Sequence, residues 1–387
     1  MIKDLDDIAW FQEGPGVRNY QYTTNGTKLI NVSNLGGVNL NLANTSRYIS
    51  NEEANSKYKH FLCDAGDLVI ASSGINETSI SEKVSIVRND DLPLCMNTSV
   101  IRFKPLNNDE LSVKYLYYFF KSDSYKKQIM KLMTGIAQLN YGPSHLHRIK
   151  INYVEKAQQE RITSQLDSLS SLVETQKKQL SLLDELIKSR FIEMFGDIVC
   201  NDKSWTTEAI TKVCPIKQYD GKITECDGKV WLLNLDLVES NTGTVLDKYY
   251  VVKSEIGNST ITFSENNVLY SKLRPYLNKV IIPDGNGYAT SELVPFYPLS
   301  QVNKYYLAYA LRSDSFVTLI NSKANGAKMP RAPMGFIRSF LLPLPPIELQ
   351  NEFASFVGQV DKSKFVVQER IKLYQELLDK KMDEYFN

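Results

Sequence analysis

The chain has 387 residues, which is more than one ordinary domain needs and enough for two or three. Hydrophobic residues make up 43% of the sequence and charged residues 23%, so each part can bury a core and wholesale disorder is excluded. The 45 Lys and Arg residues balance 44 Asp and Glu residues, which excludes a uniformly cationic, histone-like protein. Five cysteines without a C-x-x-C pair and three histidines argue against a structural zinc site or a disulfide framework. No long apolar run and no signal-peptide pattern occur, so we expect a soluble, cytoplasmic protein without a membrane partner.

Residues 1–150 are predicted to form a first globular module with strand-like runs such as D-L-V-I-A at 67–71. Its last part, 124–154, contains basic residues and no Asp or Glu. Cations without a neighbouring carboxylate suit the phosphates of DNA, and the amide side chains after Gly135 suit adenine. An ordinary surface loop is the alternative. The DNA contacts predicted here are Lys127, Lys131, Gln138, Asn140, Tyr141, His145 and Arg148.

Residues 151–196 are predicted to form a long helix. The tract 156–195 contains no Gly or Pro, and its apolar residues recur at the spacing of a heptad seam. A helix of about 40 residues is about 60 Å long, so neighbouring globular structure cannot cover the whole seam. The predicted seam residues are Ile162, Leu166, Leu169, Val173, Leu180, Leu183 and Ile187.

Residues 197–343 are predicted to form a second globular module, in which N-V-L-Y-S at 267–271 resembles the strand-like run of the first. Two stretches, 266–283 and 315–347, again lack acidic residues. Arginine suits guanine, so different residues at matching places could read different bases. The predicted DNA contacts are Lys272, Arg274, Tyr276, Lys279, Lys323, Lys328 and Arg331.

Residues 344–387 are predicted to form a second long helix, whose seam should pack antiparallel on the first to give a coiled coil. Further apolar residues off the seam (Leu172, Leu182, Leu186, Phe191 and Phe195, then Phe356, Phe365, Leu373, Leu377 and Phe386) exceed what two helices need. They favour additional partner helices, the alternative being solvated faces. The predicted seam residues of the second helix are Phe353, Val357, Val360, Val367, Ile371, Tyr374 and Leu378.

An internal repeat relates the two halves at a shift of 191 residues. Tyr115-Leu116 maps onto Tyr306-Leu307, S-D-S at 122–124 onto 313–315, and Gln159 onto Gln350. Two differing modules on matched helices indicate recognition of two different targets. An old duplication kept for stability is the alternative, since it would give the same internal repeat. The predicted fold is α+β with a pseudo-two-fold repeat: two globular modules, each a twisted, mostly antiparallel sheet with short helices, separated by two long helices in an antiparallel coiled coil.

Sequence signatures of catalysis are missing. No G-x-x-x-x-G-K-[ST] occurs, no G-x-G-x-x-G follows a strand, and the amino-methylating pattern Asn/Asp-Pro-Pro-aromatic is absent. With three histidines, a Ser/His/Asp or metal constellation is also disfavoured. We therefore expect no catalytic residue, no metal ligand and no cofactor in this chain.

The order and spacing of these segments resemble a known family. P-P-I-E-L-Q-N-E-F at 345–353, V-E-K-A-Q-Q-E-R-I at 154–162, G-D-L-V-I-A-S-S-G at 66–74 and F-Q-E-G-P-G-V-R-N at 11–19 are similar to segments of the specificity (S, HsdS) subunits of type I restriction–modification systems. The first copy lacks both prolines before its helix, and Leu349 stands where the family has Glu.

The resemblance implies a non-catalytic subunit of a complex that methylates adenine at N6 in DNA and cleaves unmethylated DNA. Each module would act as a target-recognition domain for one half of a bipartite site, and the helices would set the spacing and dock two methyltransferase (M) subunits. S-adenosylmethionine, ATP and Mg would belong to the M and restriction (R) subunits. The alternatives are a coiled-coil scaffold for protein interactions, which the low net charge favours, and an unrecognised nuclease or methyltransferase.

Overall fold

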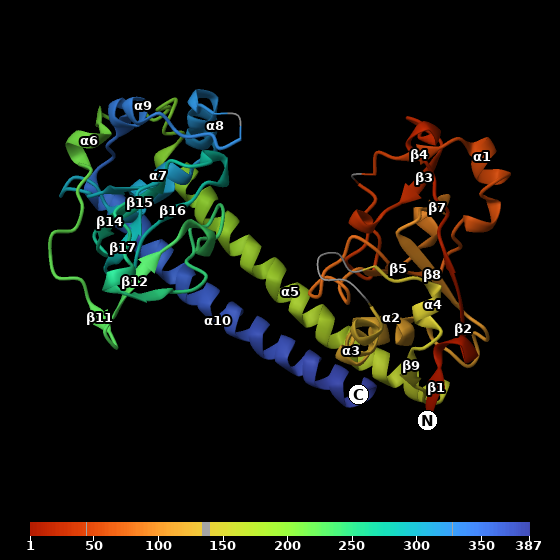
Figure 1. Cartoon of the computed structure of the whole chain (residues 1–387). Coiled ribbons are helices and arrows are strands. Elements are labelled where there is room, and N and C mark those ends of the chain that lie inside the picture. Colours follow the sequence, from red (N-terminus) through yellow and green to blue (C-terminus); the bar gives the residue numbers. More distant parts are fainter. Residues whose placement is uncertain (44, 134–139, 327) are drawn as a thin grey trace. The chain divides into compact units, whose positions relative to one another are not determined.

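Two long helices run through the chain and are shared by two compact units (Figure 1). The computed structural model describes residues 1–43, 45–133, 140–326 and 328–387. Unit 1 comprises Met1–Thr175 with Arg370–Asn387, and unit 2 comprises Gln176–Glu369. Both borders fall inside the long helices, α5 (Lys156–Phe195) and α10 (Ile347–Phe386), each of 40 residues. The two long helices predicted from the sequence are therefore confirmed.

Unit 1 is built around mostly antiparallel sheets. Its four-stranded sheet has the order β2 (Ala9–Glu13), β8 (Val100–Pro105), β5 (Leu68–Ala71), β6 (Val84–Ile86). A three-stranded sheet has the order β4 (Tyr48–Ile49), β3 (Thr27–Ile30), β7 (Leu94–Met96), with β3 and β7 parallel. A two-stranded sheet joins β1 (Ile2–Asp4) to β9 (Lys150–Asn152). Its shorter helices are α1 (Asn51–Asn55), α2 (Val113–Lys121), α3 (Asp123–Leu132) and α4 (Pro143–Leu146).

Unit 2 repeats this plan with differences at the edges. Its three-stranded sheet has the order β16 (Val280–Ile281), β15 (Val268–Ser271), β18 (Leu293–Phe296). A five-stranded sheet has the order β11 (Glu225–Cys226), β12 (Lys229–Leu233), β17 (Gly287–Thr290), β14 (Thr260–Phe263), with β13 (Tyr250–Val252) also on β12. Strands β12 and β17 are parallel, as β3 and β7 are in unit 1. A two-stranded sheet joins β10 (Thr207–Ala209) to β19 (Leu341–Pro343). Its shorter helices are α6 (Ile210–Val213), α7 (Lys304–Arg312), α8 (Asp314–Lys323) and α9 (Met334–Ser339).

The repeated S-D-S segments have the same local function in both units. Ser122 and Ser313 are the N-caps of α3 and α8, where their hydroxyls accept hydrogen bonds from the backbone N–H groups of Tyr125 and Phe316. The aspartate that follows lies in the first turn, where a negative charge is favoured by the helix dipole. These contacts explain why the segment recurs at the shift of 191 residues.

The repeated glutamine fixes each module to the start of its long helix. The Gln159 side chain accepts a hydrogen bond from the Ser112 N–H at 2.8 Å and donates to the Glu110 and Val154 carbonyls at 2.9 and 2.7 Å. Gln350 repeats the set with the Asn303 N–H and the Gln301 and Pro345 carbonyls at 2.8, 3.1 and 2.8 Å. Both side chains are fully buried. Each glutamine thereby satisfies buried backbone groups of two segments at once.

The far end of the other long helix completes each core. In unit 1 the Phe386 ring of α10 lies 5.0 Å from the Tyr115 ring, and in unit 2 the Phe195 ring of α5 lies 4.9 Å from the Tyr306 ring. The hydroxyls of Tyr115 and Tyr306 donate to the carbonyls of Asn152 and Pro343. Each module therefore packs on the beginning of one long helix and the end of the other, as a pseudo-two-fold repeat requires.

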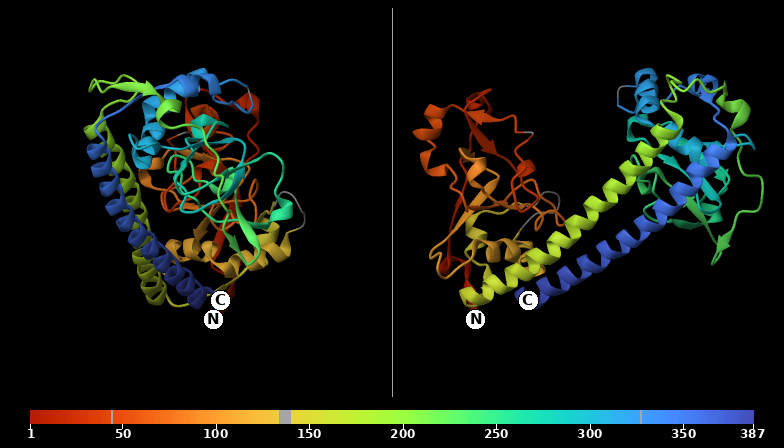
Figure 2. Two further views of the ribbon diagram at one scale, coloured as in Figure 1. Left: turned by 90° about the vertical axis from the view of Figure 1, so that its left-hand side faces the viewer. Right: turned by 180° about the vertical axis from the view of Figure 1, so that it is seen from behind.

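The paired helix segments are antiparallel in unit 2. Arg190 of α5 pairs with Glu352 of α10 at 3.1 Å, whereas the earlier residue Asp184 pairs with the later Lys364 at 2.6 Å. In unit 1 the Tyr385 hydroxyl of α10 donates to the side chain of Gln165 of α5. Figure 2 shows the two helices side by side in both views. The predicted α+β fold is confirmed. Within the described residues, no helix combines the length and apolar character needed to span a membrane.

Candidate nucleic-acid interface

Backbone hydrogen bonds bring two of the acid-free stretches together in unit 2. The loop after β15 lies beside residues 330–332, because the Arg274 N–H donates to the Pro330 carbonyl at 2.7 Å and the Ala332 N–H to the Lys272 carbonyl at 2.8 Å. Asn325 and Arg331 exchange two further backbone hydrogen bonds at 2.9 and 3.1 Å. Segments about 60 residues apart in sequence therefore form one paired-loop edge (residues 272–276 with 325–326 and 328–332).

Several predicted DNA contacts are available at this paired-loop edge. Lys328 and Arg331 are exposed, Tyr276 is 50% exposed, and Lys272 and Arg274 are partly buried. Lys323 is exposed on α8, which leads into the second loop. The edge thus presents cations, one aromatic ring and two guanidinium groups, of which that of Arg331 is exposed; such groups contact phosphates and base edges.

Arg331 has a carboxylate partner that the sequence stretches did not reveal. Its Nε lies 3.1 and 3.3 Å from the two carboxylate oxygens of Glu292, and its Nη2 lies 2.9 Å from Oε1. This carboxylate raises the pKa of the guanidinium above its ordinary value. The premise that cations of an acid-free stretch lack a neighbouring carboxylate is wrong for Arg331, because Glu292 lies between the two stretches in sequence and next to Arg331 in space.

Lys279, a predicted DNA contact, is partly buried and holds a backbone carbonyl of its own unit. Its Nζ donates to the Leu235 carbonyl at 2.6 Å, and burial lowers the pKa of its ammonium group. Lys83 occupies the matching position in unit 1 and donates to the Leu35 carbonyl at 3.0 Å. The backbone contacts of the two lysines also correspond, since their carbonyls accept hydrogen bonds from the N–H groups of Ala71 and Ser271, respectively. A repeated lysine holding a repeated loop is a feature of the fold.

Tyr141 is a core residue, so its predicted role as a DNA contact is also wrong. Its side chain is 5% exposed, and its hydroxyl donates to the Ala71 carbonyl at 2.6 Å. Its backbone N–H donates to the Ser72 carbonyl at 3.0 Å, as the N–H of the repeat-equivalent Ala332 donates to Lys272. One backbone hydrogen bond of the unit 2 pairing therefore has a counterpart in unit 1. Neighbouring Asn140 is exposed, and Gln138 lies outside the described residues.

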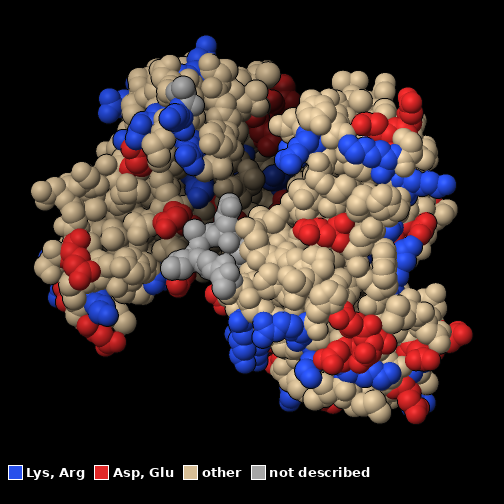
Figure 3. All heavy atoms as spheres, turned by 45° about the vertical axis from the view of Figure 1, so that its right-hand side comes forward, with Lys and Arg blue, Asp and Glu red and all other residues tan. Residues whose placement is uncertain are grey.

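The remaining predicted contacts of unit 1 differ in exposure and in their partners. Lys127, Lys131 and Arg148 are exposed, whereas the Nδ1 atom of His145 accepts a hydrogen bond from the Gly142 N–H at 3.2 Å. Acidic residues from elsewhere approach other members of the stretch: Lys126 lies 4.0 Å from Glu77, His147 2.6 Å from Asp6 and Lys150 3.4 Å from Asp4. On the face drawn in Figure 3, small groups of basic side chains alternate with small groups of acidic ones.

Backbone conformation marks the loops that follow β5 in unit 1 and β15 in unit 2. Arg274 has a φ of 48°, and Gly74, three residues beyond β5 as Arg274 is beyond β15, has a φ of 66°. Glycine adopts this left-handed conformation freely, whereas an arginine there is strained. The Arg274 Nε is buried without a hydrogen-bond partner among the described residues. Strain of this kind concentrates at functional sites.

The predicted seam is on the covered side of both helices. All of its residues are buried or partly buried (Ile162, Leu166, Leu169, Val173, Leu180, Leu183, Ile187, Phe353, Val357, Val360, Val367, Ile371, Tyr374 and Leu378). The additional apolar residues divide into two groups. Phe191, Phe195 and Phe386 are buried in the module cores, and Phe356 packs against the core of unit 2. These four side chains are therefore already covered within the chain. Leu172, Leu182, Leu186, Phe365, Leu373 and Leu377 are exposed.

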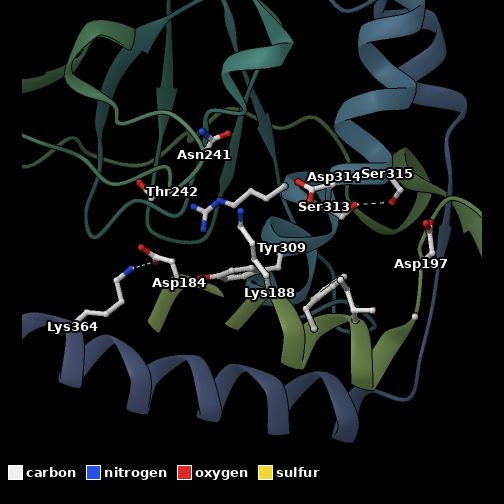
Figure 4. Close-up of a pocket in the computed structure, with 14 residues that line it drawn as sticks. Asp184, Lys188, Asp197, Asn241, Thr242, Tyr309, Ser313, Asp314, Ser315 and Lys364 are labelled. Carbon is white, nitrogen blue, oxygen red and sulfur yellow. Dashed lines mark hydrogen bonds and ion pairs between the residues drawn. The ribbon is translucent and has the colours of Figure 1, made fainter. Parts of the chain in front are cut away.

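A cavity of about 230 Å³ lies in unit 2 between the end of α5, the start of α8 and the loop at Asn241 (Figure 4). Lys188 extends into it from α5, and the Asp184–Lys364 ion pair closes one side. Its lining carries charges of both signs, and none of the predicted DNA contacts belongs to the described lining. The cavity is separate from the paired-loop edge.

Comparisons with known proteins find one family model and several relatives. Residues 2–185 match the family described as the type I restriction modification DNA specificity domain. The MjaVIII specificity subunit of Methanocaldococcus jannaschii is 24% identical over 189 residues, which are 48% of this chain and 43% of that protein. The EcoDI specificity subunit of Escherichia coli is 23% identical over 123 residues, 32% of this chain and 27% of that protein. The chain thus spans less than half the length of these two relatives. The MjaIX specificity subunit of M. jannaschii is 23% identical over 320 residues, 76% of this chain and 72% of that protein.

Solved structures share the fold over the whole chain. The S subunit of a type I restriction–modification system from M. genitalium aligns with a TM-score of 0.54 and 14% identity, covering 100% of this chain and 96% of that one. A chain from a structure of the complex assembly and conformational transition of a type I system aligns with a TM-score of 0.56 and 13% identity, covering 100% and 97%. At these identities the likeness concerns the fold alone.

Proposed function

Because residues 2–185 belong to the type I restriction–modification DNA specificity domains, we propose that the chain is the non-catalytic specificity subunit of such a system. The family match confirms the resemblance that the sequence showed. Residues 1–150 and 197–343 act as target-recognition domains, each for one half of a bipartite DNA site. The helical segments 151–196 and 344–387 connect them and set the spacing of the half-sites.

The observation that carries this proposal is a backbone hydrogen bond of the paired-loop edge that recurs in unit 1 beside a different side chain. The backbone N–H groups of Tyr141 and Ala332 hold the two loops of each unit together in the same way, while the preceding residue is Asn140 in one unit and Arg331 in the other. Amide and guanidinium groups favour different bases in the major groove. A shared backbone with exchanged polar side chains supports two readers of different sequence.

Exposed apolar residues on the long helices support docking of methyltransferase subunits. Each of these side chains is 40 to 63% exposed, although the helices that carry them have buried seams. Such residues on otherwise packed helices suit partner helices. The partner subunits would bring the chemistry: S-adenosylmethionine for methylation of adenine at N6, with ATP and Mg in the restriction subunits. The residues concerned are Leu172, Leu182, Leu186, Ile192, Phe365, Val366, Leu373 and Leu377.

Co-expression with a methyltransferase subunit tests the proposal. The chain should form a stable complex that methylates adenines in one bipartite sequence, mapped across a genome by sequencing of methylated DNA. Methylation without a bipartite consensus would contradict it. A chain that pulls down proteins but fails to retain DNA at moderate salt, alone and with the methyltransferase subunit, would favour the scaffold instead.

A further inference from the structure

We propose that Glu292 is a specificity-determining positioning residue, which holds the Arg331 guanidinium so that its free edge reads a guanine. The inference rests on the proposed function and deepens it. It adds a residue that lies outside every acid-free stretch and a base for one position of the half-site read by unit 2.

The contacts of Glu292 occupy one edge of the Arg331 guanidinium and leave its other edge without a hydrogen bond among the described residues. Nε and Nη2 of Arg331 both bond the carboxylate, at 3.1 to 3.3 Å and 2.9 Å. A guanidinium has five N–H donors in a planar fork, so Nη1 and the second hydrogen of Nη2 remain. No contact to Nη1 is found within the described residues, and the Arg331 side chain is 50% exposed. Two adjacent N–H groups in one plane match the O6 and N7 acceptors of guanine.

The backbone holds both members of the pair in place. Glu292 directly precedes strand β18, and its carbonyl accepts a hydrogen bond from the Lys272 N–H at 3.0 Å. Arg331 is fixed by its two backbone bonds with Asn325. A side chain anchored at both ends loses little further freedom when it binds, which sharpens discrimination between bases.

Stability alone does not account for the pair. An exposed ion pair contributes little to folding, and a carboxylate beside DNA phosphates weakens binding. The matching positions of unit 1 carry Ser99 and Asn140 instead, and the Ser99 hydroxyl accepts a hydrogen bond from the Ser73 hydroxyl at 2.7 Å. Both members of the pair thus differ between the two units, as expected when they serve the choice of base.

The test uses the full chain in complex with its methyltransferase subunits. Methylation rates are measured on the mapped site and on sites in which each base pair of both half-sites is replaced in turn. Arg331→Ala should lower the discrimination at a single G·C pair by about tenfold or more. Glu292→Gln and Glu292→Ala should lower it at the same pair, and Glu292→Asp, which keeps the carboxylate, should restore part of it. The double variant should equal Arg331→Ala, because Glu292 acts through Arg331.

Asp284→Asn is the matched control, since it removes one exposed carboxylate of the same unit from an ion pair with Lys248 at 2.8 Å. It should leave discrimination unchanged. Glu292 variants that change the rates on all sites equally would overturn the inference and assign Glu292 a purely electrostatic effect, as would a loss at a pair other than the one Arg331 affects. A wild-type complex without sequence preference would overturn the proposed function itself.

Discussion

At the scale of single residues, equal charges in one short segment have different roles. Lys279 donates to the backbone carbonyl of Leu235, whereas no side-chain ion pair or hydrogen bond of Lys272 is found within the described residues. Both lysines lie in the acid-free stretch 266–283. Only the position of each ammonium group relative to buried carbonyls separates the structural lysine from the available one.

Alanine substitutions distinguish the two lysines. Lys279→Ala should lower the free energy of unfolding by about 1 kcal/mol, because the Leu235 carbonyl loses its donor. Lys272→Ala should leave stability unchanged and weaken binding to all DNA sequences, with the salt slope reduced by about one. Urea unfolding and DNA binding at several salt concentrations measure both effects, and Lys83→Ala is the counterpart of Lys279→Ala in unit 1. A reduced salt slope for Lys279→Ala would return that residue to the DNA face.

Replacement of the buried glutamine tests its contacts with the helix start. Gln350→Glu should lower the stability by about 3 kcal/mol or more at neutral pH, because a buried carboxylate would face the Gln301 and Pro345 carbonyls that now accept hydrogen bonds. Burial would raise the pKa of the new carboxyl above its unfolded value, so stability should return as the pH falls and the carboxyl is protonated. Urea unfolding at pH 7 and pH 5 measures this, and exposed Gln158→Glu is the control. Equal, pH-independent stability of both variants would show that the buried amide is dispensable.

At the scale of elements, each long helix has a covered and an uncovered apolar face. In α5, Leu183 and Ile187 are partly or fully buried, while Leu182 and Leu186 are 54 and 48% exposed. The helix therefore needs only its seam for its own packing. Its second apolar face is exposed, and it is the face proposed to dock a partner.

Charged residues on the uncovered face should separate folding from assembly. The double variant Leu182→Glu, Leu186→Glu should unfold at the wild-type urea concentration, since both side chains are exposed, and should fail to retain the methyltransferase subunit in size-exclusion chromatography. The buried-face variant Ile187→Ala should instead lower the stability by about 2–4 kcal/mol. Normal assembly of the double variant would exclude this face of α5 as the docking surface.

At the scale of the whole molecule, the two units repeat one design, and the proposed recognition residues belong to each unit separately. Each unit contains its own buried glutamine, its own tyrosine bonded to a strand carbonyl and its own pair of loops. Because these contacts lie within a unit, we expect substitutions in one unit to leave the fold of the other unchanged.

Exchange of one module should therefore change one half of the recognition site. When residues 1–145 are replaced by the corresponding segment of another specificity subunit, the mapped methylation site should keep the half-site read by unit 2 and acquire a new other half. The exchanged chain should fold if the new segment keeps its backbone hydrogen bonds to the start of α5. Simultaneous change of both half-sites would contradict independent reading.

The sequence by itself determined what depends on local pattern. Heptad spacing without Gly or Pro predicted both long helices, and the repeat of S-D-S and of the glutamine predicted that the halves share one plan. The tertiary structure decided what depends on distant neighbours. Glu292 became the partner of Arg331, Lys279 a donor to Leu235, and Tyr141 a core residue, because folding brings together groups that no stretch of sequence contains. Charge along a chain indicates where cations gather, and only their contacts in space show which of them are free to bind.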